Sequence, residues 1–181
     1  MCVIIVKPAG IRMPSKDTLK MAYLANPHGC GFASTNHAFK SLSYAEFLDR
    51  LAEVGDDEAC IIHFRLATHG SIRRSNCHPF EKGGIYFAHN GVLDIKPDGD
   101  RTDSETAFLR IIHPMAEKYG IGGRETAEAV RRIIGFSKFA MMESGSREVR
   151  TFGRFMAADD GCMYSNFRFA YGRTRAKSAI S

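Results

Sequence analysis

The residue with the clearest chemical potential is Cys2, which directly follows the initiator methionine. Removal of Met1 would leave Cys2 with a thiol and a free α-amino group on one residue. A free α-amine has a pKa of about 7.7–8.0, so near neutral pH it can accept a proton from the thiol. An N-terminal nucleophile activated by its own amine is an established catalytic arrangement. Alternatively, Cys2 is a buried cysteine at the start of a strand, because Val3–Val6 is an apolar β-branched run.

A second stretch places a cation directly after an apolar run. Arg65 follows Ala59–Phe64 and opens the polar turn Arg65-Leu66-Ala67-Thr68-His69-Gly70. A guanidinium at the end of a strand can bind a carboxylate through two parallel hydrogen bonds. Thr68 and His69 lie within reach on the same turn. This turn is therefore a candidate carboxylate-binding site.

The dipeptide Asn90-Gly91 follows another apolar run, Gly84–Ala88. A side-chain amide and a glycine N–H can both donate to one developing oxyanion, and glycine permits the close approach. The same dipeptide is typical of a type I′ hairpin turn. Such a turn would connect Tyr86–Ala88 to Val92–Leu93, and the two interpretations are compatible.

Other patterns predict no metal ion and no cofactor. His28 with Cys30, and Cys77 with His78, are combinations of metal-ligand types, but the sequence contains no paired C-x-x-C and no H-x-x-x-H pattern. Gly120–Gly123 precedes a helical pattern but lacks the lysine of a phosphate-binding loop, so we interpret it as a helix-ending turn.

Strands and helices must position these residues. The sequence predicts strands at Val3–Lys7, Gly31–Ser34, Ala38–Ser41, Ala59–Phe64, Gly84–Ala88, Lys138–Met142, Val149–Phe152 and Cys162–Tyr164. It predicts helices from a Ser15 cap to about Ala25, from Ser43, from a Thr102 cap to about Tyr119, and over Glu125–Ile134. Strand clusters interrupted by helices indicate an α+β fold of packed layers. No linker or repeat divides residues 1–181, so we expect a single domain.

Composition narrows the function classes. The 181 residues are 44% hydrophobic and 25% charged, as in a globular protein. No apolar run is long enough to span a membrane and no secretory signal pattern is present, so we expect no membrane partner. Five scattered cysteines favour the reducing cytoplasm. Part of the net charge of +5 lies in a basic C-terminal tail over about 167–181, which we interpret as solvated rather than bound to nucleic acid.

Taken together, the motifs resemble those of the class II glutamine amidotransferases, whose catalytic domain is an N-terminal-nucleophile hydrolase. The matching segments span essentially the whole chain: Cys2 with its apolar run, Asn26-Pro27-His28-Gly29-Cys30-Gly31, Arg65–Gly70, His78-Pro79, His89-Asn90-Gly91, Thr102-Asp103-Ser104-Glu105 and Tyr164-Ser165-Asn166. Any single motif is weak, but this order and spacing are specific. The resemblance implies a four-layer αββα sandwich of two mainly antiparallel sheets flanked by helices.

The resemblance also implies a catalytic mechanism. Cys2 would attack the side-chain amide carbon of L-glutamine and form a γ-glutamyl thioester. Its own α-amine would act as general base and then pass the proton to departing ammonia. The Asn90 side chain and the Gly91 N–H would form the oxyanion hole.

For substrate binding, the resemblance assigns the two charged ends of glutamine to opposite charges. Arg65 would bind the α-carboxylate and Asp103 the α-ammonium, while Thr68 and His69 would complete the pocket. Asp103 also fits a purely structural role, because an acidic residue in the first turn of a helix is favoured by the helix dipole.

Three features depart from the family pattern. Leu66 stands where the sugar-phosphate-aminating members carry tryptophan, and the connection over residues 92–101 is short. The larger enzymes of the family join this domain to a synthase domain that receives ammonia, whereas this sequence ends soon after Asn166. We therefore expect a separate synthase or acceptor protein. Two alternatives stay open: an N-terminal-nucleophile amidase acting on another small amide, and a non-catalytic glutamine-binding module.

Overall fold

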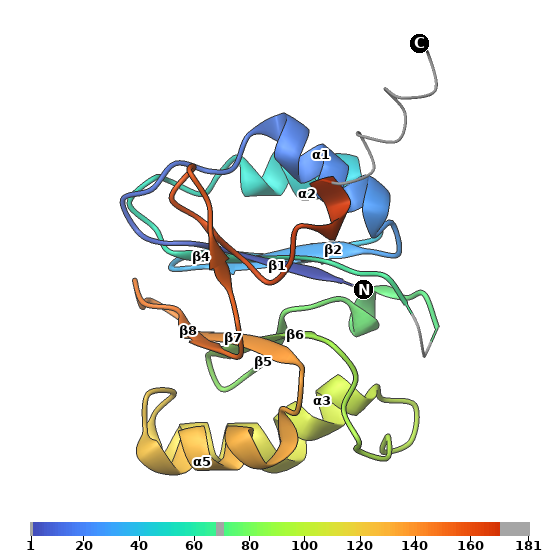
Figure 1. Cartoon of the computed structure of the whole chain (residues 1–181), viewed down its shortest axis with the longest axis vertical. Helices are drawn as coiled ribbons and strands as arrows, with labels where there is room; N and C mark the ends of the chain where they lie inside the picture. The colour runs from blue at the N-terminus through green and yellow to red at the C-terminus, as the bar shows by residue number, and fades with distance from the viewer. Residues whose placement is uncertain (1, 68–70, 171–181) are drawn as a thin grey trace.

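The computed structural model describes residues 2–67 and 71–170, and it forms four layers (Figure 1). Two β-sheets pack face to face in the centre. Helices α1 (Lys16–Ala25) and α2 (Tyr44–Leu51) cover the outer face of one sheet. Helices α3 (Asp103–Ala107), α4 (His113–Tyr119) and α5 (Arg124–Ile133) cover the other. The α+β sandwich expected from the sequence is confirmed.

The larger sheet has six strands in the order β3-β2-β4-β1-β10-β9. Their bounds are Ala38–Ser41, Cys30–Ser34, Cys60–Phe64, Val3–Lys7, Met163–Tyr164 and Met156–Ala157. The smaller sheet has the order β5-β6-β7-β8, with bounds Phe80–Lys82, Ile85–Asn90, Lys138–Glu143 and Arg150–Phe152. Each described strand pair is antiparallel. Short 3-10 turns, η1 (Arg74–Asn76) and η3 (Arg168–Ala170), complete the described elements.

The alternation of side chains along β1 accounts for its place inside the sandwich. Val3 and Ile5 pack toward α1 and α2, whereas Ile4 and Val6 pack into the layer between the two sheets. Successive strand residues point to opposite faces, so a strand that is apolar at every position is buried on both. This explains why β1 reads as a continuous apolar run, and it fixes the chain firmly just behind Cys2.

The predicted helix caps are present. Ser15, Ser43 and Thr102 each accept a hydrogen bond from the backbone N–H three residues later. Between α3 and α4 the helix continues as a π-helical turn, η2 (Phe108–Ile112). Pro114, near the start of α4, has no N–H for a regular helical bond, and a local π-turn accommodates such an interruption.

The hairpin interpretation of Asn90-Gly91 is wrong. A type I′ turn requires positive φ at both central residues, whereas the described non-glycine residues include none with positive φ. Asn90 is the last residue of β6 and pairs with Lys138, and Val92 and Leu93 lie outside the described strands. Asn90 and Gly91 therefore end a strand. The sequence also missed β5 and β9, which are only three and two residues long. No described helix is long and apolar enough to cross a membrane.

Candidate active site

Cys2 lies directly before β1, beside the turn that follows β4. Antiparallel pairing of Val3 with Phe64 brings the two chain segments together. The Cys2 Sγ accepts a 3.3 Å hydrogen bond from the Leu66 N–H and donates to the Leu66 carbonyl oxygen at 3.5 Å. The thiol is thereby held at the turn opened by Arg65.

Burial raises the pKa of the Cys2 thiol above its ordinary value. The Leu66 hydrogen bond and the positive charge of Arg65 lower the pKa, but they do not cancel the cost of desolvating a thiolate. The protonated thiol therefore dominates near neutral pH. Because the thiolate is the nucleophile, catalysis by Cys2 requires a base that removes this proton.

Residues after β10 hold both Cys2 and β6. The Asn166 Nδ2 donates to the Cys2 carbonyl oxygen at 2.9 Å. The neighbouring Ser165 Oγ accepts hydrogen bonds from the Ile4 N–H and from the Asn90 Nδ2, both at 2.8 Å. Ser165 thus links β1, which carries the thiol, to the strand that ends at Asn90. The sequence had singled out Ser165 and Asn166 as part of a motif without assigning them a role.

The Arg65 turn is supported by the segment before β2. The Arg65 N–H donates to the Gly29 carbonyl oxygen at 2.8 Å, and the His28 N–H donates to the Arg65 carbonyl oxygen at 2.9 Å. The Ala67 N–H donates to the His28 Nδ1 at 3.0 Å. The Arg65 Nη1 donates to the Ser71 carbonyl oxygen at 3.1 Å. His28, considered from the sequence as a metal-ligand type, therefore serves as a hydrogen-bond acceptor for this turn.

Asp103 is oriented by three donors at the start of α3. Its Oδ2 accepts from the Leu93 N–H at 2.9 Å. Its Oδ1 accepts from the Ser104 N–H at 2.8 Å and from the Ser104 Oγ at 3.2 Å. Ser104 Oγ is also 2.7 Å from the His89 Nδ1. These bonds define the direction of the carboxylate and connect it to the end of β6.

A single small pocket brings most of the predicted site residues together. Its walls include Cys2, Arg65, Gly91 and Asp103, and the remaining lining residues are Leu66, Ala67, Asn76, His78, His89, Val92, Thr102 and Ser104. Among these residues Arg65 is the cation and Asp103 the carboxylate. The cavity volume is about 50 Å³, well below the roughly 300–1,000 Å³ of typical small-molecule sites.

The other predicted site residues are placed differently. Asn90 lies immediately before Gly91 but does not line the pocket; it is 2% exposed and bonded to Ser165. Its Nδ2 carries a second hydrogen that this bond does not use. Thr68 and His69 lie outside the described residues.

Three buried histidines behind the pocket were not predicted as a group. The His63 Nε2 is 3.0 Å from the His78 Nδ1 and 3.2 Å from the His89 carbonyl oxygen. Burial lowers the pKa of His63 to about 3 and that of His89 to about 4, and it holds the pKa of His78 well below its usual value. All three rings are therefore neutral at physiological pH. Two of them, His78 and His89, line the pocket and contribute polar atoms without charge.

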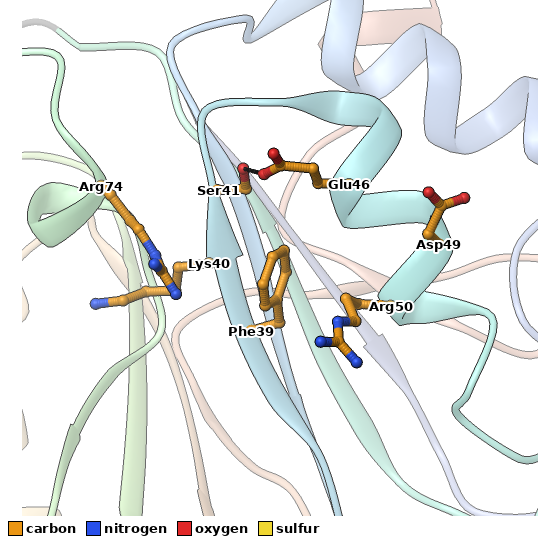
Figure 2. A pocket seen from close by; sticks show the side chains of 7 residues that line it. All are labelled: Phe39, Lys40, Ser41, Glu46, Asp49, Arg50 and Arg74. Atoms are coloured by element: carbon orange, nitrogen blue, oxygen red, sulfur yellow. Dashed lines mark hydrogen bonds between the residues drawn. The ribbon is translucent and has the colours of Figure 1, made fainter.

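A larger recess of about 350 Å³ lies elsewhere, between β3 and α2 (Figure 2). The Phe39 ring is contacted there by the guanidinium groups of Arg50 and Arg74, and Ser41 donates to Glu46 at 2.6 Å. None of the predicted site residues lines this recess. Within residues 2–67 and 71–170, no group of three or more histidine, cysteine, aspartate or glutamate side chains could hold a metal ion.

Comparisons with known proteins identify the family of this chain. A family model described as glutamine amidotransferases class-II matches residues 32–150, a segment that contains Arg65, Asn90 and Asp103 but not Cys2. The glutamine--fructose-6-phosphate aminotransferase (isomerizing) of Gluconobacter oxydans (strain 621H) is 31% identical over 91 residues, which cover 44% of this chain and 15% of that protein. The protein of the same name from Geobacillus kaustophilus (strain HTA426) is 30% identical over 111 residues, which cover 56% of this chain and 18% of the relative. The chain thus matches less than a fifth of the length of these curated relatives.

Proposed function

This chain belongs to the class-II glutamine amidotransferases, and we propose that it hydrolyses the side-chain amide of L-glutamine through Cys2 and passes the ammonia to a separate acceptor protein. The family accounts for an enzyme that acts on the amide nitrogen of glutamine. The nucleophile, the pocket residues and the fate of the ammonia are parts of the proposal.

The observation that carries the proposal is the composition of the pocket that contains Cys2. A thiol, a guanidinium and a carboxylate face one small space. Free glutamine is a zwitterion, so its α-carboxylate and α-ammonium suit Arg65 and Asp103 respectively. The Arg65 side chain is 5% exposed, and a charge pair formed away from bulk water is stronger than one at the surface. A free amino acid therefore fits the pocket better than an uncharged amide.

The reaction proceeds in two steps. The Cys2 Sγ attacks the amide carbon, the carbonyl oxygen becomes an oxyanion, and the carbon–nitrogen bond then breaks to release ammonia and leave a γ-glutamyl thioester. Water next attacks the thioester and releases glutamate and the free thiol. The Gly91 N–H and the second Asn90 Nδ2 hydrogen stabilise the oxyanion, and loss of one such donor typically costs about a hundredfold to a thousandfold in kcat.

The base in this proposal is the α-amine of Cys2, freed by removal of Met1. The raised pKa of the thiol makes a base necessary. The histidines that line the pocket are weak bases, because burial lowers the pKa of His89 to about 4 and holds that of His78 well below its usual value. An amine on Cys2 itself has a pKa of about 7.7–8.0 and is tethered beside the thiol. It can therefore take the thiol proton and then pass it to the departing ammonia.

The test compares glutamate release by the chain lacking Met1 with release by a form in which Met1 is retained. Intact mass identifies the two forms. We expect the processed protein to release glutamate and ammonia in equal amounts from glutamine, and the Met1-retaining form and Cys2→Ala to be at least a hundredfold slower. Cys162→Ala removes another buried thiol and is expected to keep the native rate.

Two outcomes would contradict the proposal. Equal rates for the native protein and Cys2→Ala would exclude Cys2 as the nucleophile. Hydrolysis of other γ-amides without hydrolysis of glutamine would favour an amidase of different specificity. The separate acceptor would be supported by two results together. The isolated chain would release free ammonia into solution, and the ammonia would be incorporated into a product only when an acceptor protein is added.

A further inference from the structure

The strand end Asn90-Gly91 is connected to the start of α3 on both of its sides. Before it, the His89 Nδ1 lies 2.7 Å from the Ser104 Oγ. After it, the Leu93 N–H donates to the Asp103 Oδ2 at 2.9 Å. The proposed oxyanion donors are thus bracketed by two bonds to the pair Asp103-Ser104. One of these bonds comes from the backbone and the other depends on a single hydroxyl group.

Proton counting gives the direction of the bonds at this hydroxyl. Ser104 has one hydroxyl hydrogen, and an ionised carboxylate can only accept. We assign this hydrogen to the bond with the Asp103 Oδ1 at 3.2 Å; in this assignment the His89 Nδ1 carries the hydrogen that Ser104 accepts. The neutral ring then has its proton on Nδ1 and none on Nε2. The result is a directed chain from His89 through Ser104 to Asp103.

The hydrogen bonds that connect His89, Ser104 and Asp103 lie in the buried part of the structure. His89 is 2% exposed and Ser104 is 5% exposed. The His89 ring packs edge-on against Phe139, with ring centroids 5.2 Å apart. Buried hydrogen bonds between packed elements hold geometry better than exposed ones, because water cannot replace the missing partner. This contact therefore helps to fix the distance between β6 and α3, together with the Leu93–Asp103 bond.

We propose that Ser104 is a positioning residue that sets the distance between the oxyanion donors at Asn90-Gly91 and the carboxylate of Asp103, and thereby selects glutamine over asparagine. The inference rests on the function proposed above. Glutamine and asparagine carry the same charged groups and the same amide, and they differ by one methylene between them. A site with a fixed spacing between the amide end and the ammonium end can tell the two apart.

The inference is tested by binding, which does not depend on catalysis. In a Cys2→Ala background, calorimetry gives the Kd for glutamine and for asparagine with Ser104, Ser104→Ala and Ser104→Thr. We expect Ser104→Ala to weaken glutamine binding about tenfold and asparagine binding less than about threefold, because a buried donor loses its partner and the spacing relaxes. Ser104→Thr keeps the hydroxyl and is expected to stay within about threefold of Ser104.

The ratio of the two dissociation constants separates positioning from general stability. A merely structural role would weaken both amino acids equally, and that result, or no change in either, would overturn the inference. Ser146→Ala alters an exposed turn and serves as the control. Nitrogen-15 NMR of His89 supplies a second measurement: a hydrogen on Nδ1 supports the chain, and a hydrogen on Nε2 alone contradicts it.

The proposed function and this inference can fail separately. A native protein that releases no glutamate, combined with Ser104-dependent glutamine binding in the Cys2→Ala background, would remove the catalytic proposal and keep the positioning role. Glutamate release by the native protein, combined with an unchanged ratio of the glutamine and asparagine dissociation constants in Ser104→Ala, would keep the catalytic proposal and remove the positioning role.

Discussion

The side-chain amide of Asn166 donates a 2.9 Å hydrogen bond to the carbonyl oxygen of Cys2, across 164 positions of sequence. Cys2 directly precedes β1 and Asn166 comes shortly after β10, and these two strands are antiparallel neighbours. Asn166 is 8% exposed. The proposed nucleophile is therefore held by its thiol, at Leu66, and by its backbone, at Asn166, so that both the sulfur and the chain behind it have defined positions.

Loss of the Asn166 side chain should impair catalysis more than folding. Asn166→Ala removes the only described side-chain bond to the Cys2 backbone and lets the thiol shift. Displacements of about 1 Å at a reacting group can cost up to about a hundredfold in rate, and we expect kcat/KM for glutamine to fall at least tenfold. Glutamate release measures the effect. Asn36→Ala, on the turn between β2 and β3, should leave kcat/KM unchanged; an active Asn166→Ala would show that the backbone bond is dispensable.

Gly91 should not tolerate a side chain. Its φ is +149°, and a Cβ there would lie 2.2 Å from the Ser137 Oγ and 2.9 Å from the Ser137 Cα. Gly91→Ala is expected to move the proposed oxyanion N–H and lower kcat about a hundredfold. Ser137→Gly should not fully rescue this variant, because the backbone contact remains. Gly99→Ala is the control, because Gly99 also has a positive φ but has open space around a new Cβ. A comparable loss of kcat in Gly99→Ala would show that backbone strain alone accounts for the effect.

Acid should destabilise the fold through its buried histidines. The pKa of His63 is about 3 and that of His89 about 4 in the folded chain, against about 6.5 in the unfolded chain. Below pH 6.5 these two histidines therefore bind protons in the unfolded state while they stay neutral in the folded state. The free energy of unfolding should fall as the pH drops toward 4, by up to about 1.4 kcal/mol per pH unit for each histidine.

Denaturant unfolding at several pH values between 7 and 4 measures this slope. His63→Gln should reduce it, because one buried histidine no longer contributes to proton uptake. Identical slopes for native protein and His63→Gln would be inconsistent with a neutral, buried His63.

A separate buried cation should govern stability without affecting the pocket. Lys7 is fully buried at the end of β1, and its Nζ donates to the carbonyl oxygens of Gly55, Asp56 and Glu58 at 3.2, 2.9 and 2.6 Å. Lys7→Met leaves three carbonyls without this donor, and we expect a loss of about 3 kcal/mol.

In a domain of this size that loss corresponds to a fall in Tm of roughly 10 °C. Thermal unfolding measures it, with Lys16→Met on the exposed start of α1 as the control. Glutamine hydrolysis at 25 °C should be unchanged in Lys7→Met. A variant with native Tm would show that water or the neighbouring backbone replaces the lysine.

Local sequence signals predicted the long elements and their caps. β1, α1 and α5 begin and end within a residue or two of expectation, and α2 and α3 begin directly after their predicted caps, because periodic apolar residues and the capping residues Ser15, Ser43 and Thr102 act over a few positions. The short strands β5 and β9 were missed for the same reason: two or three residues hold no recognisable period. The Asn90-Gly91 hairpin failed because pairing of β6 with β7 extends the strand through Asn90, a tertiary effect that overrides the local preference of the dipeptide.

The sequence by itself determined the residue types and their order: a cysteine behind the initiator methionine, an arginine after one strand, an asparagine and a glycine after another, and an acid at a helix start. Tertiary structure decided which of these meet. Pairing of β1 between β4 and β10 brings Cys2 against Leu66 and Asn166, and the Ser104–His89 contact joins α3 to β6. Such contacts join residues far apart in the chain, and they form because the central strands β1, β2 and β4 are buried on both faces in one layered core. No local pattern encodes them.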